Sequence, residues 1–162
     1  MPNHCTNILE IDGDAETIER IREVLDDRER EDEALTFEGL LPRPEALKGI
    51  KYGRSTIGGK TVKRWKETED SGRVPITEAE TKRLREKHGG ADLLEWSRAH
   101  WGTKWNSYWS ELEEEGGESL RYRFTTAWGP PDQFVAALRE AFPKATIQLH
   151  FREPNMGMAG TL

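Results

Sequence analysis

The spacing of apolar residues predicts a strand followed by a helix at the start of the chain. In Ile8-Leu9-Glu10-Ile11-Asp12, two apolar residues alternate with acidic neighbours at the period of two that is typical of a half-buried strand. Asp14 is placed to cap a helix from Ala15 to about Arg30. The apolar residues of this segment recur at three- and four-residue steps and form one stripe: Ile18, Ile21, Val24 and Leu25.

The last third of the chain repeats this order. Tyr122, Phe124 and Thr126 alternate with their neighbours and predict a strand. The segment Gly129-Pro130-Pro131-Asp132 ends it and starts a helix, whose apolar stripe runs from Phe134 to Phe142. A closing strand is predicted where Ile147, Leu149 and Phe151 alternate with polar residues.

These elements predict an α+β fold. A further short strand is expected near Leu35-Thr36-Phe37. The resulting order is the ferredoxin-like β-α-β-β-α-β plan, with a four-stranded antiparallel sheet and two helices on one face. We expect a single domain over residues 1–162, with a long hairpin and helical insertion at about 43–112.

The insertion has its own signals. Gly58-Gly59 favours a two-residue hairpin turn, which would pair Tyr52 with Trp65, Arg54 with Lys63 and Thr56 with Thr61, and would put two aromatic and two cationic side chains on one face. A helix is predicted from the capping box Thr77-Glu78-Ala79-Glu80 to the stop Gly89-Gly90. A short helix near Leu93 to Trp101 follows.

Charge is distributed in blocks along a chain whose net charge is −6. The segment Glu10 to Glu38 has a net charge of −9, and Pro42 to Lys66 has +7. Opposite blocks of this kind are usually solvated faces, but they also dock on charged partners.

No apolar stretch approaches the ~18 residues of a membrane span. One cysteine, Cys5, cannot form an intramolecular disulfide, and the first residues do not resemble a secretory signal, so we expect a cytoplasmic protein.

The sequence supplies no complete catalytic, metal or cofactor motif. Gly58-Gly59-Lys60-Thr61 resembles the end of a phosphate-binding loop, but Arg54 stands where that loop requires glycine. Cys5 and the four histidines lack the spacing of a zinc site. Cys5 itself sits at a strand start and not at a helix N-terminus, where a reactive thiol is often found. We therefore assign no catalytic residue, no metal and no cofactor, and an enzyme of unknown class stays a minor alternative.

Tryptophan is the least ordinary feature of the composition. Five of six tryptophans fall within residues 96–128, and Trp101, Trp105 and Trp109 recur every four residues, which on a helix would give one stripe. Such a cluster either packs the insertion onto the sheet or forms a recognition surface. Our main hypothesis is a non-catalytic module that binds a macromolecule, most simply a protein. Its predicted partner-binding residues are Trp101, Lys104, Trp105, Trp109 and Trp128.

The basic hairpin at 51–66 supports an alternative, nucleic-acid binding. Cations for phosphates and aromatic faces for bases are interleaved there. The residues predicted for this site are Tyr52, Arg54, Lys60, Lys63, Arg64 and Trp65. The negative net charge of the whole chain opposes nucleic-acid binding, because it repels phosphate groups. The oligomeric state is not readable from the sequence.

Several fragments occur in the order seen in a known family. They are Met1-Pro2-Asn3-His4-Cys5-Thr6-Asn7, Leu41-Pro42-Arg43-Pro44-Glu45, Trp101-Gly102-Thr103-Lys104-Trp105-Asn106, Phe124-Thr125-Thr126-Ala127-Trp128-Gly129-Pro130-Pro131, and Phe151-Arg152-Glu153-Pro154 with Gly160. With these motifs the chain resembles the YubB ferredoxin-like family, small proteins carried by bacteriophages, prophages and plasmids. The resemblance implies a ferredoxin-like fold and a mobile-element origin, hence the cytoplasm of a bacterial host cell, and brings no established activity.

Overall fold

The structure, a computed structural model, describes residues 3–70 and 72–162. The chain forms two compact units. Unit 1 combines the residues up to Pro42 with His100–Leu162, and unit 2 is Arg43–Ala99.

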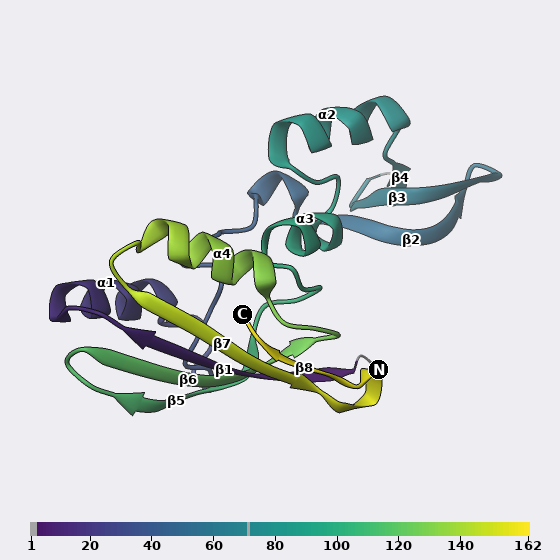
Figure 1. Cartoon of the computed structure of the whole chain (residues 1–162). Helices are drawn as coiled ribbons and strands as arrows, with labels where there is room; N and C mark the ends of the chain where they lie inside the picture. Colours follow the sequence, from purple (N-terminus) through teal and green to yellow (C-terminus); the bar gives the residue numbers. More distant parts are fainter. Residues whose placement is uncertain (1–2, 71) are drawn as a thin grey trace. The chain divides into compact units, whose positions relative to one another are not determined.

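Unit 1 is built on an antiparallel sheet with the strand order β5-β6-β1-β7-β8. Its strands are β1 (His4–Asp12), β5 (Tyr108–Glu115), β6 (Ser119–Ala127), β7 (Thr146–Glu153) and β8 (Met158–Thr161), and the short 3-10 helix η2 (Pro154–Met156) joins the last two. Helices α1 (Ala15–Leu25) and α4 (Asp132–Ala141) lie over the same face of this sheet (Figure 1). The predicted four-stranded sheet is five-stranded, because three of the predicted strands form, as β1, β6 and β7, and β5 and β8 are added at its two edges.

Alternation along the central strand places the core. Leu9 and Ile11 of β1 are fully buried, while Glu10 between them is only partly covered. The stripe of α1 packs on this face, with Ile21 and Leu25 fully buried. Each such side chain stabilises the fold by roughly 1.5–3 kcal/mol relative to its exposed state.

Helix α1 begins as predicted and ends early. The Asp14 carboxylate accepts the N–H of Thr17 at 2.8 Å, which is the expected N-cap. The helix stops at Leu25, not near Arg30, because Arg30 is bound outside it. Its guanidinium donates to the carbonyls of Ser107 and Leu35 and pairs with Asp27.

The strand predicted at Leu35-Thr36-Phe37 does not form. Leu35 and Phe37 are fully buried, but the backbone here is not part of a sheet ladder. The Phe37 N–H donates to the Asn106 side chain at 2.8 Å, and the Leu35 carbonyl accepts from the Ser107 hydroxyl. Side chains thus satisfy the polar groups that a neighbouring strand would have bonded.

One edge strand of the sheet is β5, which the sequence did not reveal. It pairs with β6 from Tyr108 opposite Thr125 to Glu115 opposite Leu120, with two register shifts. The insertion limit expected at about 112 falls inside this strand.

Unit 2 contains a three-stranded antiparallel sheet in the order β2-β3-β4 with two helices. Its elements are η1 (Glu45–Leu47), β2 (Ile50–Ile57), β3 (Lys60–Thr68), β4 (Gly72–Pro75), α2 (Glu78–His88) and α3 (Leu93–His100), the last ending at the boundary with unit 1. The predicted turn and helices are confirmed. Gly58 and Gly59 have positive φ, the Thr77 side chain caps α2, and Gly89 ends α2 in the left-handed conformation.

Candidate functional site

The structure divides the predicted tryptophan residues between core and surface. Trp101 is fully buried, packs against Phe37 with ring centroids 5.6 Å apart, and donates from Nε1 to the Leu41 carbonyl. Trp105, Trp109 and Trp128 are 43%, 65% and 44% exposed. The predicted helical stripe is wrong, because α3 ends at His100 and Trp109 lies in β5. Trp101 belongs to the core of unit 1, and the other three present surface.

Two of the exposed tryptophans have strained backbones. Trp109 has a φ of +51° and Trp128 a φ of +75°. Within residues 3–70 and 72–162 they are the only non-glycine residues with positive φ. This conformation costs a bulky residue about 1–3 kcal/mol and persists only when the surroundings enforce it.

A carboxylate holds Trp109 in this conformation. Glu33 accepts the N–H groups of Trp109 and Ser110, each at 2.8 Å, and also the Ser110 hydroxyl. The Ser110 hydroxyl oxygen in turn accepts the N–H of Ala34. These hydrogen bonds attach the acidic segment after α1 to the edge strand β5. They also fix the backbone conformation of Trp109 and therefore the direction of its ring.

Trp109 is part of an aromatic cluster on the sheet face that α1 and α4 leave open. The His4 ring lies 4.9 Å from the Trp109 ring, and His4 Nδ1 is 2.8 Å from the Tyr108 hydroxyl. The Trp128 N–H donates to the carbonyl of Asn3, the residue before His4. We call the contacting rings of His4, Tyr108 and Trp109, together with the exposed ring of Trp128 just after β6, the aromatic surface. It occupies the end of the sheet where β1 begins and β6 ends.

A buried polar chain fixes the turn that carries Trp128. Asn7 is fully buried and donates to the Thr126 hydroxyl at 2.8 Å and to the Cys5 carbonyl at 3.0 Å. The Thr126 hydroxyl donates to the Gly129 carbonyl at 2.7 Å. Because buried hydrogen bonds of this kind are expensive to break, the turn around Trp128 is anchored to the core.

Lys104 and Trp105 lie on the loop before β5. Lys104 Nζ lies 4.6 Å from the centroid of the Trp105 ring, a cation–π distance. The Thr103 hydroxyl donates to the Trp105 carbonyl and orders this loop. The pair offers a second exposed aromatic position on unit 1.

The two units carry opposite charge. Unit 2 has fourteen Lys and Arg residues against nine Asp and Glu, a net charge of +5. Unit 1 holds the remaining ten basic and twenty-one acidic residues, a net charge of −11. The net charge of the whole chain is therefore negative although unit 2 by itself is positively charged.

The predicted pairing of the basic hairpin is only partly correct. Thr56 pairs with Thr61 as predicted, but a register shift between Tyr52 and Ser55 places Tyr52 opposite Arg64 and Lys51 opposite Trp65. Tyr52 and Trp65 therefore lie on opposite faces of the hairpin. The reason is the extra residue at Gly53-Arg54, where Gly53 has a φ of +156° and its Cα hydrogens face the Trp65 ring.

The predicted nucleic-acid residues differ in their availability. Arg54, Lys60 and Lys63 are exposed. Trp65 is partly buried, with the Arg73 guanidinium 5.6 Å from its ring. Arg64 is committed to ion pairs, at 2.6 Å from Asp92 and 2.7 Å from Glu95, with 11% of its side chain exposed.

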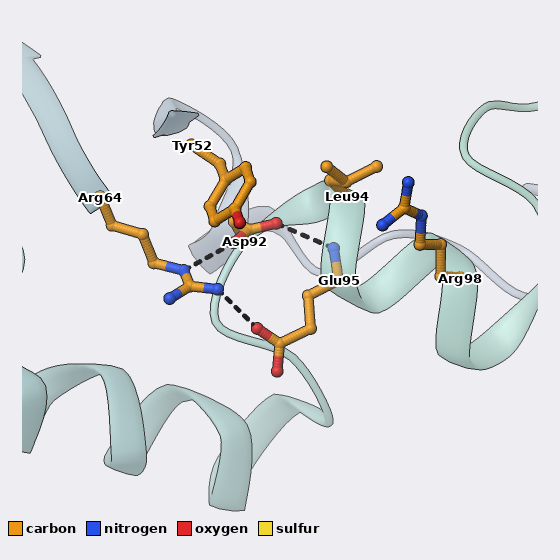
Figure 2. Close-up of a pocket in the computed structure, with 6 residues that line it drawn as sticks. All are labelled: Tyr52, Arg64, Asp92, Leu94, Glu95 and Arg98. Atoms are coloured by element: carbon orange, nitrogen blue, oxygen red, sulfur yellow. Dashed lines mark hydrogen bonds and ion pairs between the residues drawn. The ribbon is translucent and has the colours of Figure 1, made fainter. Parts of the chain in front are cut away.

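Arg64 forms one wall of a pocket of about 220 Å³ in unit 2. The pocket is lined by Tyr52, Arg64, Asp92, Leu94, Glu95 and Arg98, as Figure 2 shows. The Tyr52 ring is 54% exposed and packs on the Arg64 guanidinium at 5.1 Å. Sequence reasoning missed Leu94 and Arg98, although their four-residue spacing on a predicted helix places them on one face.

Cys5 is buried and its thiol is unreactive. Burial raises the pKa of its thiol to about 11, so the thiol is protonated at neutral pH. Among the described residues no group of three or more His, Cys, Asp or Glu side chains is arranged to hold a metal ion. His150 lies near Glu10 and Thr161, and His4 lies in the aromatic surface.

The comparisons with known proteins identify the class of fold. Residues 104–162 match the family model described as the ferredoxin-like domain in Api92-like protein. This segment contains β5, β6, α4, β7 and β8. Unit 1 is thus a ferredoxin-like α+β domain with an antiparallel sheet.

A solved structure is similar over almost the whole chain. It is the crystal structure of a protein api92 from Yersinia pseudotuberculosis, with a TM-score of 0.57 and 11% sequence identity. The alignment covers 99% of this chain and 93% of that chain. At this identity the likeness concerns the fold. No curated protein matches the chain.

None of the helices that the structure describes has the length and apolar character needed to cross a membrane.

Proposed function

We propose that the chain is a non-catalytic binding protein that holds a protein partner on the aromatic surface of unit 1. The supporting observation is the backbone of Trp109 and Trp128. Both residues adopt a strained backbone conformation. Both also leave a large apolar ring exposed to solvent, where it gains no free energy from burial in the core of unit 1. Strain maintained at exposed aromatic residues favours a role in recognition over one in packing.

The aromatic composition fits a protein interface. Tryptophan, tyrosine and arginine are enriched among the residues that dominate binding energy, and rigid rings lose little conformational entropy on binding. The Trp109 ring is already supported by His4, and its backbone by Glu33. A preorganised surface of this kind binds more tightly than a mobile one.

Charge indicates the chemistry of the partner. Unit 1 carries a net charge of −11, so association with a basic protein surface is electrostatically favoured. The mobile-element origin implied by the resemblance to the YubB family is part of this proposal. The partner would then be a protein of the host or of the element.

The experiment compares capture by matched variants. The chain, a Trp109→Ala/Trp128→Ala variant and a Tyr52→Ala control are immobilised and exposed to lysate from the organism that encodes the chain. Tyr52 is an exposed aromatic residue of unit 2, so the control removes an equal kind of side chain outside the aromatic surface. We expect a basic protein to bind the chain and the control, and to be lost from the double variant.

Two results would contradict the proposal. One is capture of the same proteins by the double variant. The other is self-association as the sole event that depends on Trp109 and Trp128, measured by sedimentation. Circular dichroism of the double variant checks that unit 1 is folded.

A further inference from the structure

The pocket of unit 2 combines a stacking platform with a free cation. One face of the exposed Tyr52 ring rests on Arg64, and Asp92 and Glu95 hold that guanidinium in place. The ring is therefore fixed from behind, and its other face remains available. A rigid aromatic face of this kind is what a planar ligand group stacks on.

The charged residues that line the pocket, Arg64, Arg98, Asp92 and Glu95, sum to zero, but Arg85 from outside the lining adds a further positive charge. The two carboxylates, Asp92 and Glu95, are matched by the guanidiniums of Arg64 and Arg85, the latter at 2.6 Å from Glu95. Arg98 makes no hydrogen bond or ion pair with any residue that the structure describes. It lies one turn of α3 after Leu94, and Figure 2 shows both side chains on the same side of the helix. Arg64 and Arg85 thus match the two carboxylates, and among the described residues the guanidinium of Arg98 is left without an ion pair, beside the apolar side chain of Leu94.

The hairpin extends this positive charge. Arg54 at the bulge of β2 and Lys60 at the start of β3 are exposed, whereas Lys51 is opposite Trp65 and, like Lys63, lies on the face of the hairpin away from Tyr52. Unit 2 as a whole has a net charge of +5. A polyanion with planar groups is the ligand that satisfies the ring, the free guanidinium and the exposed cations together.

We propose that unit 2 binds single-stranded nucleic acid, with one base stacked on Tyr52 and a neighbouring phosphate on Arg98. Arg54 and Lys60 of the hairpin contact further phosphates of the strand. This site differs from the one that the sequence predicts, because Arg64 supports the ring instead of binding phosphate, and Trp65 lies on the other face. It is also separate from the aromatic surface of unit 1, so each proposal stands without the other.

The test measures binding of fluorescent twelve-nucleotide oligothymidylate and oligouridylate by anisotropy at low salt. We expect Tyr52→Ala to weaken binding by about 5- to 100-fold, the range that loss of one base–aromatic stack gives. Tyr52→Phe keeps the ring and binds like the unchanged chain. Comparison of the DNA and RNA oligomers shows which sugar the site accepts.

Arg98→Gln tests the phosphate contact. It is expected to weaken binding and to lower the dependence of log K on log salt by up to about one. Arg83→Gln is its control, since Arg83 is an exposed arginine of α2 outside the pocket. A loss in Arg98→Gln that Arg83→Gln does not share supports the specific site.

Three outcomes would overturn the proposal. The first is no binding of either oligomer at low salt. The second is equal binding by Tyr52→Ala and the unchanged chain, which would indicate charge attraction alone. The third is displacement of the oligomer by polyglutamate as effectively as by unlabelled oligomer, which would indicate an acidic protein ligand.

Discussion

The carboxylate of Glu33 accepts the backbone N–H of Trp109 at 2.8 Å and thereby holds the most exposed tryptophan of the chain in a left-handed conformation. The two residues are 76 positions apart, and the contact joins the acidic segment after α1 to the edge strand β5. The proposed recognition function depends on this contact, because it determines where the Trp109 ring points.

Replacement of Glu33 tests the contact directly. Glu33→Ala leaves the N–H groups of Trp109 and Ser110 without their acceptor, and we expect a loss of about 1–3 kcal/mol in the free energy of unfolding. Amide exchange at these two residues should become faster, and binding of the partner should weaken although no aromatic residue has changed. Glu31→Ala, at an exposed position of the same segment, is the control. Unchanged exchange at Trp109 would show that Glu33 does not hold it.

The strain at Trp109 gives a second prediction. Glycine adopts positive φ without steric cost, whereas alanine does not. Trp109→Gly should therefore be more stable than Trp109→Ala by about 1 kcal/mol in urea unfolding, and the same order is expected at Trp128. At Trp105, where φ is not positive, alanine should equal or exceed glycine. If Trp109→Ala were more stable than Trp109→Gly, the backbone of Trp109 would not be strained.

Arg64 has a structural role that the hairpin sequence does not indicate. Its partner Asp92 is almost fully buried, so Arg64→Met leaves an uncompensated carboxylate and should destabilise unit 2 by about 3–5 kcal/mol. Arg85→Met breaks a more exposed pair with Glu95 and should destabilise unit 2 much less than Arg64→Met, because solvent screens this pair. Hydrogen exchange followed over residues 43–99 measures the difference. Equal effects of the two substitutions would contradict the assignment of Arg64 as a buried structural cation.

The elements that sequence reasoning placed correctly are those with strong local signals. The period-two alternation around Leu9, the Asp14 cap, the Thr77 capping box and the Gly58-Gly59 turn all act within a few residues. Such signals can be found from the sequence because the interactions that cause them are local.

The elements that it missed depend on distant residues. Leu35 and Phe37 have the composition of a strand, but side chains from residues 106–110 take their backbone hydrogen bonds. The strand β5 reads Tyr-Trp-Ser-Glu-Leu-Glu-Glu-Glu, which lacks apolar alternation because an edge strand exposes much of its length. One of its bulges also places Trp109 out of the regular alternation.

The candidate sites show the same limit. The sequence predicts the exposed tryptophans as binding residues together with Trp101, since a count of aromatic residues does not separate core from surface. It does not predict Arg98, because an isolated arginine on a helix has no distinguishing pattern. Its role in the pocket depends on which cations are already paired, and Arg64 and Arg85 are paired by residues from α3 and the turn before it.

The buried thiol of Cys5 predicts how stability changes at alkaline pH. Burial raises its pKa from 9.0 to about 11, so between these values the unfolded chain releases the proton and the folded chain keeps it. The folded state then binds more protons, and stability must fall as pH rises through this window, by up to about 2–3 kcal/mol. Below the unfolded pKa the thiol is protonated in both the folded and the unfolded chain, so this loss of stability is absent. Tyr122, whose pKa burial raises to about 12, acts in the same direction.

Cys5→Ser separates the thiol from Tyr122, because serine does not titrate in this range while Tyr122 is unchanged. Urea unfolding of the chain and of the variant is compared at about pH 8 and about pH 10.5, on either side of the unfolded thiol value. The stability difference between the two proteins should shift in favour of Cys5→Ser at the higher pH. Parallel stability losses in both proteins would mean that the thiol ionises as readily in the folded chain as in the unfolded one, and that Cys5 is not held in the apolar interior beneath the helices.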